Sequence, residues 1–503
     1  MLTRRQFVVI GSLAGLGLVT GCSGEDGPSS SSSPTTPGFT PPTQAPSSRT
    51  PDVRATYTAG AMNWSFGETD VKTWGYDSKI PGPLLRATAG DLVEITLANE
   101  LSEATSVHWH GLAIINDMDG VPGVTQGDIE PGSEFKYRFV VPDPGTYWFH
   151  PHHGLQLERG LYAPFIIDDP DEHVDAEVDY VMVLDDWLDG TGTTPEEEYE
   201  RIRADGMAMG DMSGMDHSSM DMGDSMGMAT STLLGGDAGD ARYPFHIING
   251  RSPQDPATIE PLPKPGDRVR LRFINASADT AYRVAVAEHQ MTVTHTDGYP
   301  VVPVEVDTFL IGMGERYDVT VEVKSGTWPV VALAEGKDQK AGAILRTSDT
   351  NAGSNIKFEA SELEGKLLSY SDLRAYERAR LTPADDITTL DVSLTGNMMM
   401  SDWGINGKPY GENDPIAVEA GRWYSLNITN DTMMWHPIHV HGHTPQIGKA
   451  AGGVRKDTVN VLPGENIQLV FQANNPGEWM LHCHNAYHLE AGMATSLRYS
   501  SND

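Results

Sequence analysis

The chain has 503 residues and is strongly acidic, with 70 Asp and Glu residues against 35 Lys and Arg and a formal net charge of −35. Its length allows two to four domains with sizeable cores, and its acidity argues against nucleic acid as a partner. It also holds 52 glycines and 33 prolines. Short aromatic and β-branched runs between these turn residues predict an all-β protein.

The N-terminus has the pattern of an export signal. Thr3–Phe7 has the form of a twin-arginine motif, and the apolar stretch from Val8 to Val19 is too short and too glycine-rich for a membrane span. The residues around Cys22 resemble a bacterial lipobox. We therefore predict a signal over 1–22 and a lipid anchor on Cys22 at the outer face of the cytoplasmic membrane, with plain export as the alternative. An acylated Cys22 leaves Cys483 without a disulfide partner.

Three repeated units follow a low-complexity segment. Residues 23–53 are dominated by Ser, Pro, Thr and Gly and predict a disordered linker. Each repeat has an entry strand, a glycine turn and a strand that ends in an asparagine. These asparagines are Asn99, Asn275 and Asn430. The repeats predict three related β-sandwich domains over 54–172, 173–370 and 371–503.

The segment 206–230 does not fit a β-domain. It contains eight methionines, at positions 207, 209, 212, 215, 220, 222, 226 and 228, interleaved with aspartates. It has no strand or helix period, so we expect a flexible insertion in the middle domain. Thioethers select Cu(I), and the segment therefore predicts copper handling; the alternative is a mobile loop without a role.

Four His-x-His pairs lie in the first and third repeats. They are His108/His110, His150/His152, His439/His441 and His482/His484. Side chains of a strand alternate between its faces, so both histidines of a pair point the same way. Eight imidazoles exceed the four ligands of a structural zinc site and predict a metal cluster between two domains. The equivalent stretch of the middle repeat, 281–285, has no histidine, which predicts a scaffold.

Cys483 lies between His482 and His484, and the same alternation turns it to the opposite side. There it can meet His436, His488 and Met493. Two imidazoles, a thiolate and a weak axial thioether form a blue-copper electron-transfer site. Cys483 would then link two metal centres covalently.

These motifs resemble the multicopper oxidases. The resemblance rests on His108-Trp109-His110-Gly111, Trp148-Phe149-His150-Pro151-His152, His436-Pro437-Ile438-His439-Val440-His441-Gly442 and the segment from His482 to Met493. It implies three consecutive cupredoxin-like Greek-key β-sandwich domains and four copper ions. Type 1 copper would be bound by His436, Cys483, His488 and Met493, and type 2 copper by His108 and His439. The type 3 pair would be bound by His110, His150, His152, His441, His482 and His484. The signal, the axial Met and the Met-rich insertion are most similar to bacterial laccase-like copper-resistance oxidases, including the lipoprotein form of actinobacteria.

Candidate residues for proton supply and for substrate binding are distinct from the predicted copper ligands. Asp119 lies where similar enzymes place an acid near the cluster, with a plain turn aspartate as the alternative. Some relatives carry a glutamate after the last type 1 histidine, but this chain has Leu489 there and Glu490 one position later, which leaves the second proton donor open. Met434 matches a residue that binds substrate copper in cuprous oxidases, although Thr432 replaces the usual aspartate. Ordinary packing is the alternative for Met434.

We therefore expect an oxidase that takes electrons from Cu(I), and also from Fe(II) or phenols, and reduces dioxygen to water. Asp119, His482, Cys483 and His484 would carry the catalysis, and the enzyme would provide copper tolerance at the cell envelope. We expect a monomer whose membrane contact is limited to the lipid on Cys22. A general phenol-oxidising laccase and a non-catalytic copper store or carrier are the alternatives. A nitrite reductase is disfavoured by the eight cluster histidines.

Overall fold

The computed structural model describes residues 42–212, 229–350, 356–397 and 402–500, without the side chains of 207–212. Within these ranges no helix is both long and apolar enough to cross a membrane. The predicted signal, Cys22 and the middle of the Met-rich segment lie outside the described residues.

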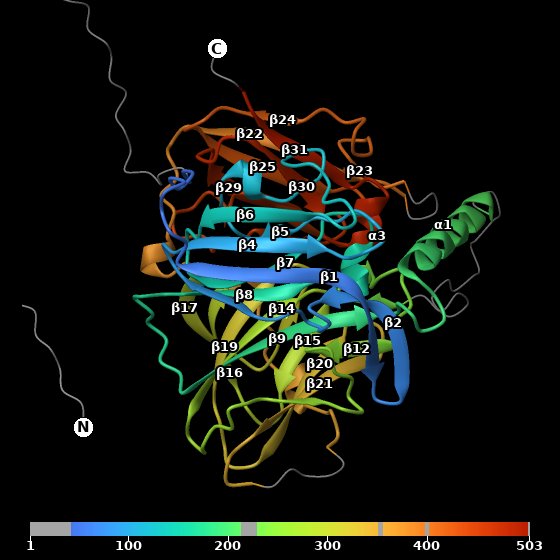
Figure 1. Ribbon diagram of the computed structural model, residues 1–503, viewed down its shortest axis with the longest axis vertical. Coiled ribbons are helices and arrows are strands. Elements are labelled where there is room, and N and C mark those ends of the chain that lie inside the picture. The colour runs from blue at the N-terminus through green and yellow to red at the C-terminus, as the bar shows by residue number, and fades with distance from the viewer. Residues whose placement is uncertain (1–41, 213–228, 351–355, 398–401, 501–503) are drawn as a thin grey trace, which may run out of the picture. The chain divides into compact units, whose positions relative to one another are not determined.

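The first domain is a sandwich of two four-stranded sheets, ordered β2-β1-β4-β6 and β3-β8-β7-β5 (Figure 1). Its elements are β1 (Val53–Phe66), β2 (Thr69–Tyr76), β3 (Leu85–Thr88), β4 (Leu92–Asn99), β5 (His108–His110), η1 (Asn116–Met118), β6 (Glu134–Val140), β7 (Gly145–His150), η2 (Gln156–Arg159) and β8 (Ala163–Asp168).

The second domain pairs a six-stranded sheet, ordered β12-β9-β14-β19-β16-β17, with a five-stranded sheet, ordered β13-β21-β20-β15-β18. Its elements are β9 (Val178–Trp187), α1 (Pro195–Met212), β10 (Thr230–Ser231), β11 (Gly236–Asp237), β12 (Phe245–Ile248), β13 (Ala257–Thr258), β14 (Arg268–Asn275), β15 (Tyr282–Val286), β16 (Met291–Thr296), β17 (Tyr299–Val306), β18 (Phe309–Ile311), β19 (Arg316–Glu322), β20 (Thr327–Ala334) and β21 (Gln339–Arg346).

Short 3₁₀ helices lead into the third domain, which has two five-stranded sheets, ordered β23-β22-β25-β29-β27 and β24-β31-β30-β26-β28. Its elements and those of the connection are η3 (Ser361–Glu364), η4 (Tyr370–Asp372), η5 (Glu377–Ala379), β22 (Ile387–Thr395), β23 (Gly404–Ile405), β24 (Ile416–Val418), β25 (Trp423–Asn430), β26 (His436–Val440), β27 (Gln446–Ile447), β28 (Thr458–Val461), β29 (Asn466–Gln472), β30 (Glu478–Cys483), α3 (Ala486–Glu490) and β31 (Ala494–Tyr499).

The three domains share one topology. Each pairs its first strand in parallel with a later one: β1 with β4, β9 with β14, and β22 with β25. Each has a second parallel pair in its other sheet: β3 with β8, β13 with β21, and β24 with β31. β5, β15 and β26 then occupy equivalent positions beside β7, β20 and β30. The predicted all-β architecture of three related sandwiches is confirmed.

The repeated asparagines explain how each domain enters that equivalent strand. Asn99 Nδ2 donates to the backbone oxygens of two loops, at Glu103 and Ile129, and its Oδ1 accepts from the backbone N–H two residues on. Asn275 and Asn430 make the same set of bonds in their own domains. Because a buried amide pairs all its polar groups in this way, the asparagine fixes the turn that leads to β5, β15 or β26.

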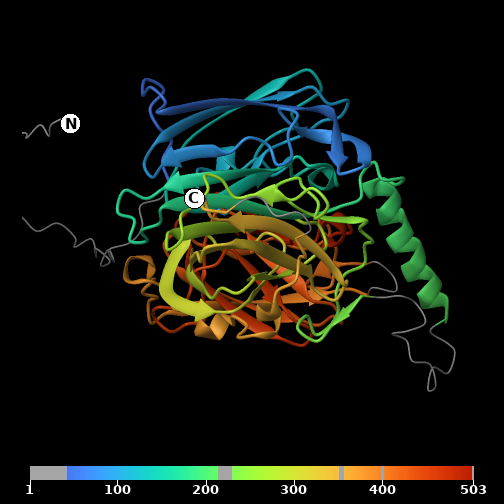
Figure 2. The same ribbon diagram turned by 90° about the horizontal axis from the view of Figure 1, so that it is seen from below.

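Two segments differ from expectation. Part of the predicted disordered linker is packed, because the Arg138 side chain donates to the backbone oxygens of Ala45, Pro46 and Arg49. The segment expected to lack regular structure from residue 206 begins inside α1, which continues to Met212 and lies beside the sheets in both views (Figure 2). Thr194 starts this helix with a reciprocal capping box: Glu197 N–H donates to its hydroxyl, and its own N–H donates to the Glu197 carboxylate. Pro195 and three glutamates in the first turn also favour this start.

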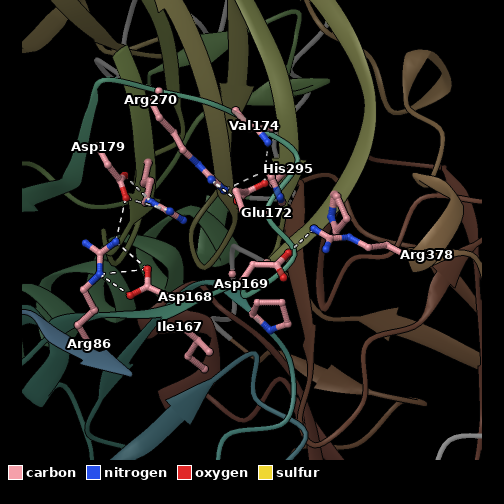
Figure 3. A pocket seen from close by; sticks show the side chains of 16 residues that line it. Arg86, Ile167, Asp168, Asp169, Glu172, Val174, Asp179, Arg270, His295 and Arg378 are labelled. Carbon is pink, nitrogen blue, oxygen red and sulfur yellow. Dashed lines mark hydrogen bonds and ion pairs between the residues drawn. The ribbon is translucent and has the colours of Figure 1, made fainter. Parts of the chain in front are cut away.

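A charged pocket of about 160 Å³ marks the junction of the first and second domains (Figure 3). Arg86 of β3 pairs with Asp168 and Asp179, while Arg270 of β14 pairs with Glu172 of the connecting segment. None of the residues that line this pocket belongs to the predicted copper sites. Its paired charges hold the connection between the domains in place.

Candidate metal centres

The predicted histidine pairs lie on equivalent strands of the first and third domains. His108 of β5 lies opposite His150 of β7, and His439 of β26 lies opposite His482 of β30. Strand β5 alone contains a complete pair. In the other three pairs the second histidine follows the strand end, where a backbone hydrogen bond holds it. These bonds run from His152 N to Ser106 Oγ, from His441 N to Met480 O and from His484 N to Pro437 O.

All eight imidazoles come together between the two domains. Rings from the first domain stack on rings from the third: His108 on His441 with centroids 3.7 Å apart, and His110 on His439 at 3.8 Å. Ligand nitrogens of three sets lie within 4.8 Å of one another. These sets are His108/His439/His441, His108/His110/His150 and His152/His441/His482. The structure therefore brings the eight predicted histidines to one interface, with seven of them buried and His152 half-buried.

Asp119 engages one imidazole from each domain. The ring of His108 donates through Nδ1 to the Asp119 backbone oxygen at 2.9 Å, and His441 donates through Nδ1 to the Asp119 carboxylate at 2.9 Å. The carboxylate is fully buried. Gly120 permits this arrangement, because a Cβ at its φ of +83° would lie 1.6 Å from the Val107 backbone oxygen. Asp119 therefore ends the 3₁₀ turn η1 and also contacts two of the clustered imidazoles.

Asp457 and Thr458 engage a second pair of imidazoles. His439 Nδ1 lies 3.0 Å from the Asp457 backbone oxygen and 3.1 Å from Thr458 Oγ1. His110 uses its other nitrogen, Nε2, which lies 3.2 Å from the same hydroxyl. Because the hydroxyl donates to Asp457 Oδ1 at 2.9 Å, it accepts from both rings. His110 is therefore left with Nδ1 free, and His439 with Nε2 free.

The remaining nitrogens fit metal ions. His150 and His482 donate through Nδ1 to the backbone oxygens of Pro151 and Cys483. In each ring described so far, one nitrogen donates its proton in a hydrogen bond, and the other nitrogen is therefore unprotonated. Four of these buried atoms have no partner: His108 Nε2, His110 Nδ1, His150 Nε2 and His439 Nε2. His441 and His482 instead face each other through Nε2 at 3.0 Å. Two unprotonated nitrogens gain nothing from such proximity unless they share a cation, so the residues fit a bound metal cluster.

The electrostatics favour the ligating form of these rings. Burial is the main cause that lowers their pKa values, and neighbouring imidazoles lower them further. The affected residues are His110, His150, His152, His439, His441, His482 and His484. Neutral imidazole is the form that binds a metal.

A second, smaller set lies on the other side of β30. Cys483 Sγ lies 3.7 Å from His436 Nδ1 and 3.7 Å from His488 Nδ1, and the two nitrogens are 3.1 Å apart. Met493 is buried in the same core cluster, and its backbone oxygen accepts from Cys483 N–H. Burial raises the pKa of the thiol, so metal binding must displace its proton. The structure thus brings His436, Cys483 and His488 together, and it buries Met493 in the same core.

Neighbouring side chains that the sequence analysis missed orient this second set. Thr432 Oγ1 lies 2.8 Å from His436 Nε2, which leaves Nδ1 for a metal. Asp240 Oδ2 of the middle domain lies 3.4 Å from His488 Nε2, and Trp403 packs against both rings. Thr432, where the resemblance leads us to expect an aspartate, therefore holds a ligand ring through its hydroxyl.

The residues considered for substrate separate into buried and exposed groups. Met434 is 1% exposed and packs in the core of the third domain, whereas Met433 is 88% exposed. Asp237 pairs with Met434 in a backbone bridge. Its carboxylate has one oxygen without a partner, and burial, together with nearby Asp240, raises its pKa to about 7.

A cavity of about 310 Å³ reaches the cluster from the side of His150, His152, His482 and His484. Leu489 and Glu490 both line it. The single turn of α3 thus brings Glu490, one position later than the glutamate of some relatives, to the same cavity as Leu489. It offers a path for a small molecule to the four histidines.

The chain matches three family models described as multicopper oxidase, over residues 58–172, 178–350 and 383–503. It is 48% identical to the multicopper oxidase MmcO of Mycobacterium tuberculosis over 454 residues, which cover 89% of this chain and 87% of that protein. It is 27% identical to copper resistance protein A of Escherichia coli, with 89% and 93% covered. A solved multicopper oxidase from Pseudomonas thermotolerans superimposes with a TM-score of 0.67 at 24% identity, covering 89% of this chain and all of that one. A Botrytis aclada laccase superimposes with a TM-score of 0.69 at 24% identity, with 88% and 87% covered.

Proposed function

The chain belongs to the multicopper oxidase family, and we propose that within this family of oxygen-dependent oxidoreductases it is a cuprous oxidase. It would take single electrons from Cu(I), and also from Fe(II) or phenols, and reduce dioxygen to water. Four copper ions would be bound: one by His436, Cys483, His488 and Met493, and three by the eight clustered histidines. The observation that carries the proposal is that Cys483 faces one ligand set while its chain neighbours face the other.

Copper supplies one-electron redox chemistry at both ligand sets. Cys483 is bonded through the backbone to His482 and to His484, so the two sets are joined by a short covalent path. This path makes each electron taken up at the cysteine available at the cluster. A copper store or carrier has no need of such a connection.

Acidic groups beside His488 favour a cationic reductant. Asp240 Oδ2 lies 3.4 Å from the outer nitrogen of the His488 ring, and Asp237 lies close enough to Asp240 for the two carboxylates to interact electrostatically. Met433, the chain neighbour of the residue that bridges to Asp237, exposes a thioether. Carboxylates attract a cation, and a thioether selects the cuprous state. Copper resistance protein A, to which the chain is similar, bears a name that fits this role.

The test is oxygen uptake with Cu(I), Fe(II) and a phenol, measured side by side on the copper-loaded enzyme. A double Asp237→Asn, Asp240→Asn variant should raise KM for Cu(I) by about tenfold, ~1.4 kcal/mol of lost attraction, and leave the phenol less affected. A double Asp385→Asn, Asp386→Asn variant makes the same two substitutions at exposed positions and serves as the matched control. Equal losses for Cu(I) and phenol would contradict the cuprous assignment.

A broad phenol-oxidising laccase is the second candidate, because laccases are among the similar proteins and Asp240 could accept a phenolic proton. It predicts high phenol turnover that added copper does not enhance. Absence of oxygen uptake with any reductant would instead favour a copper store.

The Met-rich segment 206–230 is proposed to collect Cu(I). Replacing its methionines at 215, 220, 222, 226 and 228 by serine leaves α1 untouched. Turnover of Cu(I) at low concentration should fall while phenol turnover is kept. Unchanged kinetics with both would remove the segment from the mechanism.

The proposed setting is the cell envelope, where the enzyme would act as a lipid-anchored monomer and provide copper tolerance. A Cys22→Ala variant should move the protein from the membrane fraction to the soluble fraction, and Arg4→Lys with Arg5→Lys should block export. Membrane retention of the Cys22→Ala protein would refute the lipid anchor.

A further inference from the structure

Arg316 of the middle domain is a fully buried cation that contacts all three domains. Its Nη1 and Nη2 donate to the two oxygens of Asp457 in the third domain, at 2.6 and 2.7 Å. Its Nε donates to the backbone oxygen of Thr146 on β7 of the first domain, and Nη1 also donates to the Gly314 oxygen. A two-pronged guanidinium–carboxylate pair fixes the orientation of both groups.

Asp457 in turn orients two cluster histidines. Its Oδ1 accepts from Thr458 Oγ1 and lies 3.4 Å from both His110 Nε2 and His439 Nδ1. The stacked rings of His110 and His439 therefore share one acceptor group made of a carboxylate and a hydroxyl. That group decides which nitrogen of each ring is free to face the cluster.

Two glycines provide independent evidence that the middle domain lies close to the histidine cluster. A Cβ on Gly111, directly after His110, would lie 2.3 Å from Arg316 Nη2 and 2.7 Å from Asp457 Oδ2. A Cβ on Gly314 would lie 2.8 Å from the His484 ring and 3.0 Å from the His110 ring. The loop that precedes β19 is thus packed directly against cluster histidines.

We propose that Arg316 is a positioning residue of the histidine cluster: it locks Asp457 so that His110 and His439 present Nδ1 and Nε2, respectively, to bound copper. The middle domain, which supplies none of the proposed copper ligands, would then determine the geometry of the copper site shared by its neighbours. This inference rests on the proposed cluster and adds a third domain to its machinery. Lysine could replace the charge of Arg316 but not its two parallel bonds.

The experiment compares Arg316→Lys and Arg316→Met with a matched pair, Arg270→Lys and Arg270→Met. Arg270 forms a buried ion pair with Asp318 in the same domain. It lines the charged pocket at the junction of the first and second domains, and none of the residues that line this pocket belongs to the predicted copper sites (Figure 3). The readouts are bound copper per chain, the electron paramagnetic resonance spectrum of the type 2 copper, and the blue absorption of the cysteine site.

Both Arg316 variants should keep the blue absorption, change the type 2 spectrum and bind cluster copper about 10- to 100-fold more weakly, as expected when a group that orients metal ligands is lost. The Arg270 variants should leave the type 2 spectrum unchanged. A Gly111→Ala variant, which retains both partners but forces them apart, should reproduce the spectral change and reports on the inference if the Arg316 variants do not fold.

An unchanged type 2 spectrum and copper content in the folded Arg316 variants would overturn the inference, as would an equal change in the Arg270 variants. If the Arg316 variants do not fold, an unchanged spectrum in Gly111→Ala overturns it. A wild-type protein without cluster copper would instead refute the proposed function, so the two failures are distinguishable.

Discussion

Replacing Asp119 separates two roles of its carboxylate: holding the His441 ring and supplying protons for dioxygen reduction. The carboxylate is fully buried and accepts from His441 Nδ1 at 2.9 Å. Asp119→Asn keeps an acceptor of nearly the same shape but removes the charge and the exchangeable proton. Asp119→Ala removes the acceptor as well.

The hydrogen bond between His441 and Asp119 sets the expected effects on copper affinity and on the rate of catalysis. A hydrogen bond to a charged group contributes about 1.5–3 kcal/mol, and a buried donor left without a partner costs about 1–3 kcal/mol. The alanine variant should therefore bind cluster copper about 5- to 150-fold more weakly, whereas the asparagine variant should lose about 1 kcal/mol. Loss of a proton-transferring group slows catalysis by about 10²- to 10⁴-fold, and both variants share that loss.

The assay uses copper-loaded enzyme that is first reduced without oxygen and then mixed with it. Bleaching of the blue absorption during reduction reports the cysteine site and should proceed at the wild-type rate in both variants. The blue absorption returns on mixing with oxygen at a rate that reports oxygen reduction at the cluster, and this rate should be lower in both variants. A copper-replete Asp119→Asn enzyme that reoxidises as fast as the wild type would refute a proton role for Asp119 and leave it a purely structural acceptor.

Three further outcomes follow from the structure. A Cys483→Ser protein should lose the blue absorption and almost all oxidase activity while metal analysis still finds most of the cluster copper; a blue variant would contradict the ligand assignment. Gly120→Ala should lower the melting temperature and slow oxygen reduction, because its Cβ meets the Val107 backbone oxygen at 1.6 Å, and wild-type values for both would argue against the described turn. The Glu172 carboxyl has its pKa lowered to about 2, against the opposing cost of burial, mainly by Arg270. A lowered carboxyl pKa stabilises the folded state at pH values above the unfolded pKa of 4.5, and this stabilisation is lost as the pH falls toward 2. Glu172→Gln should therefore lower the free energy of unfolding, measured with urea at pH 7, by about 1–2 kcal/mol after allowance for the partial exposure of Glu172. The difference from the wild type should shrink at pH 3, and a constant difference would contradict the ion-pair explanation.

The sequence indicated the local part of the cluster because strand alternation is a property of the chain itself. Neighbouring side chains of a strand face opposite sides, so His482 had to point away from Cys483. His484 lies beyond the end of β30, where its bond to the Pro437 backbone oxygen holds it. The asparagines at 99, 275 and 430 likewise indicated the repeat, since each closes the same turn. These inferences needed no knowledge of which domains touch.

Other features depended on contacts between distant segments. Burial separates Met434 from Met433, although the two are adjacent and chemically identical. Glu490 reaches the cavity because α3 turns once after its cap at Asn485. The first residues of the Met-rich segment are helical because the capping box at Thr194 starts α1 at Pro195, and the helix continues into the segment as far as Met212. None of these outcomes follows from the period of the surrounding residues.

The sequence by itself therefore determined the fold class, the ligand types and the opposite directions in which His482 and Cys483 face. The tertiary structure alone decided that Arg316 and Asp457 meet beside His110, across 141 residues of chain. The physical reason is that alternation and turn chemistry act over a few residues, whereas a buried ion pair forms wherever packing brings two distant charges together.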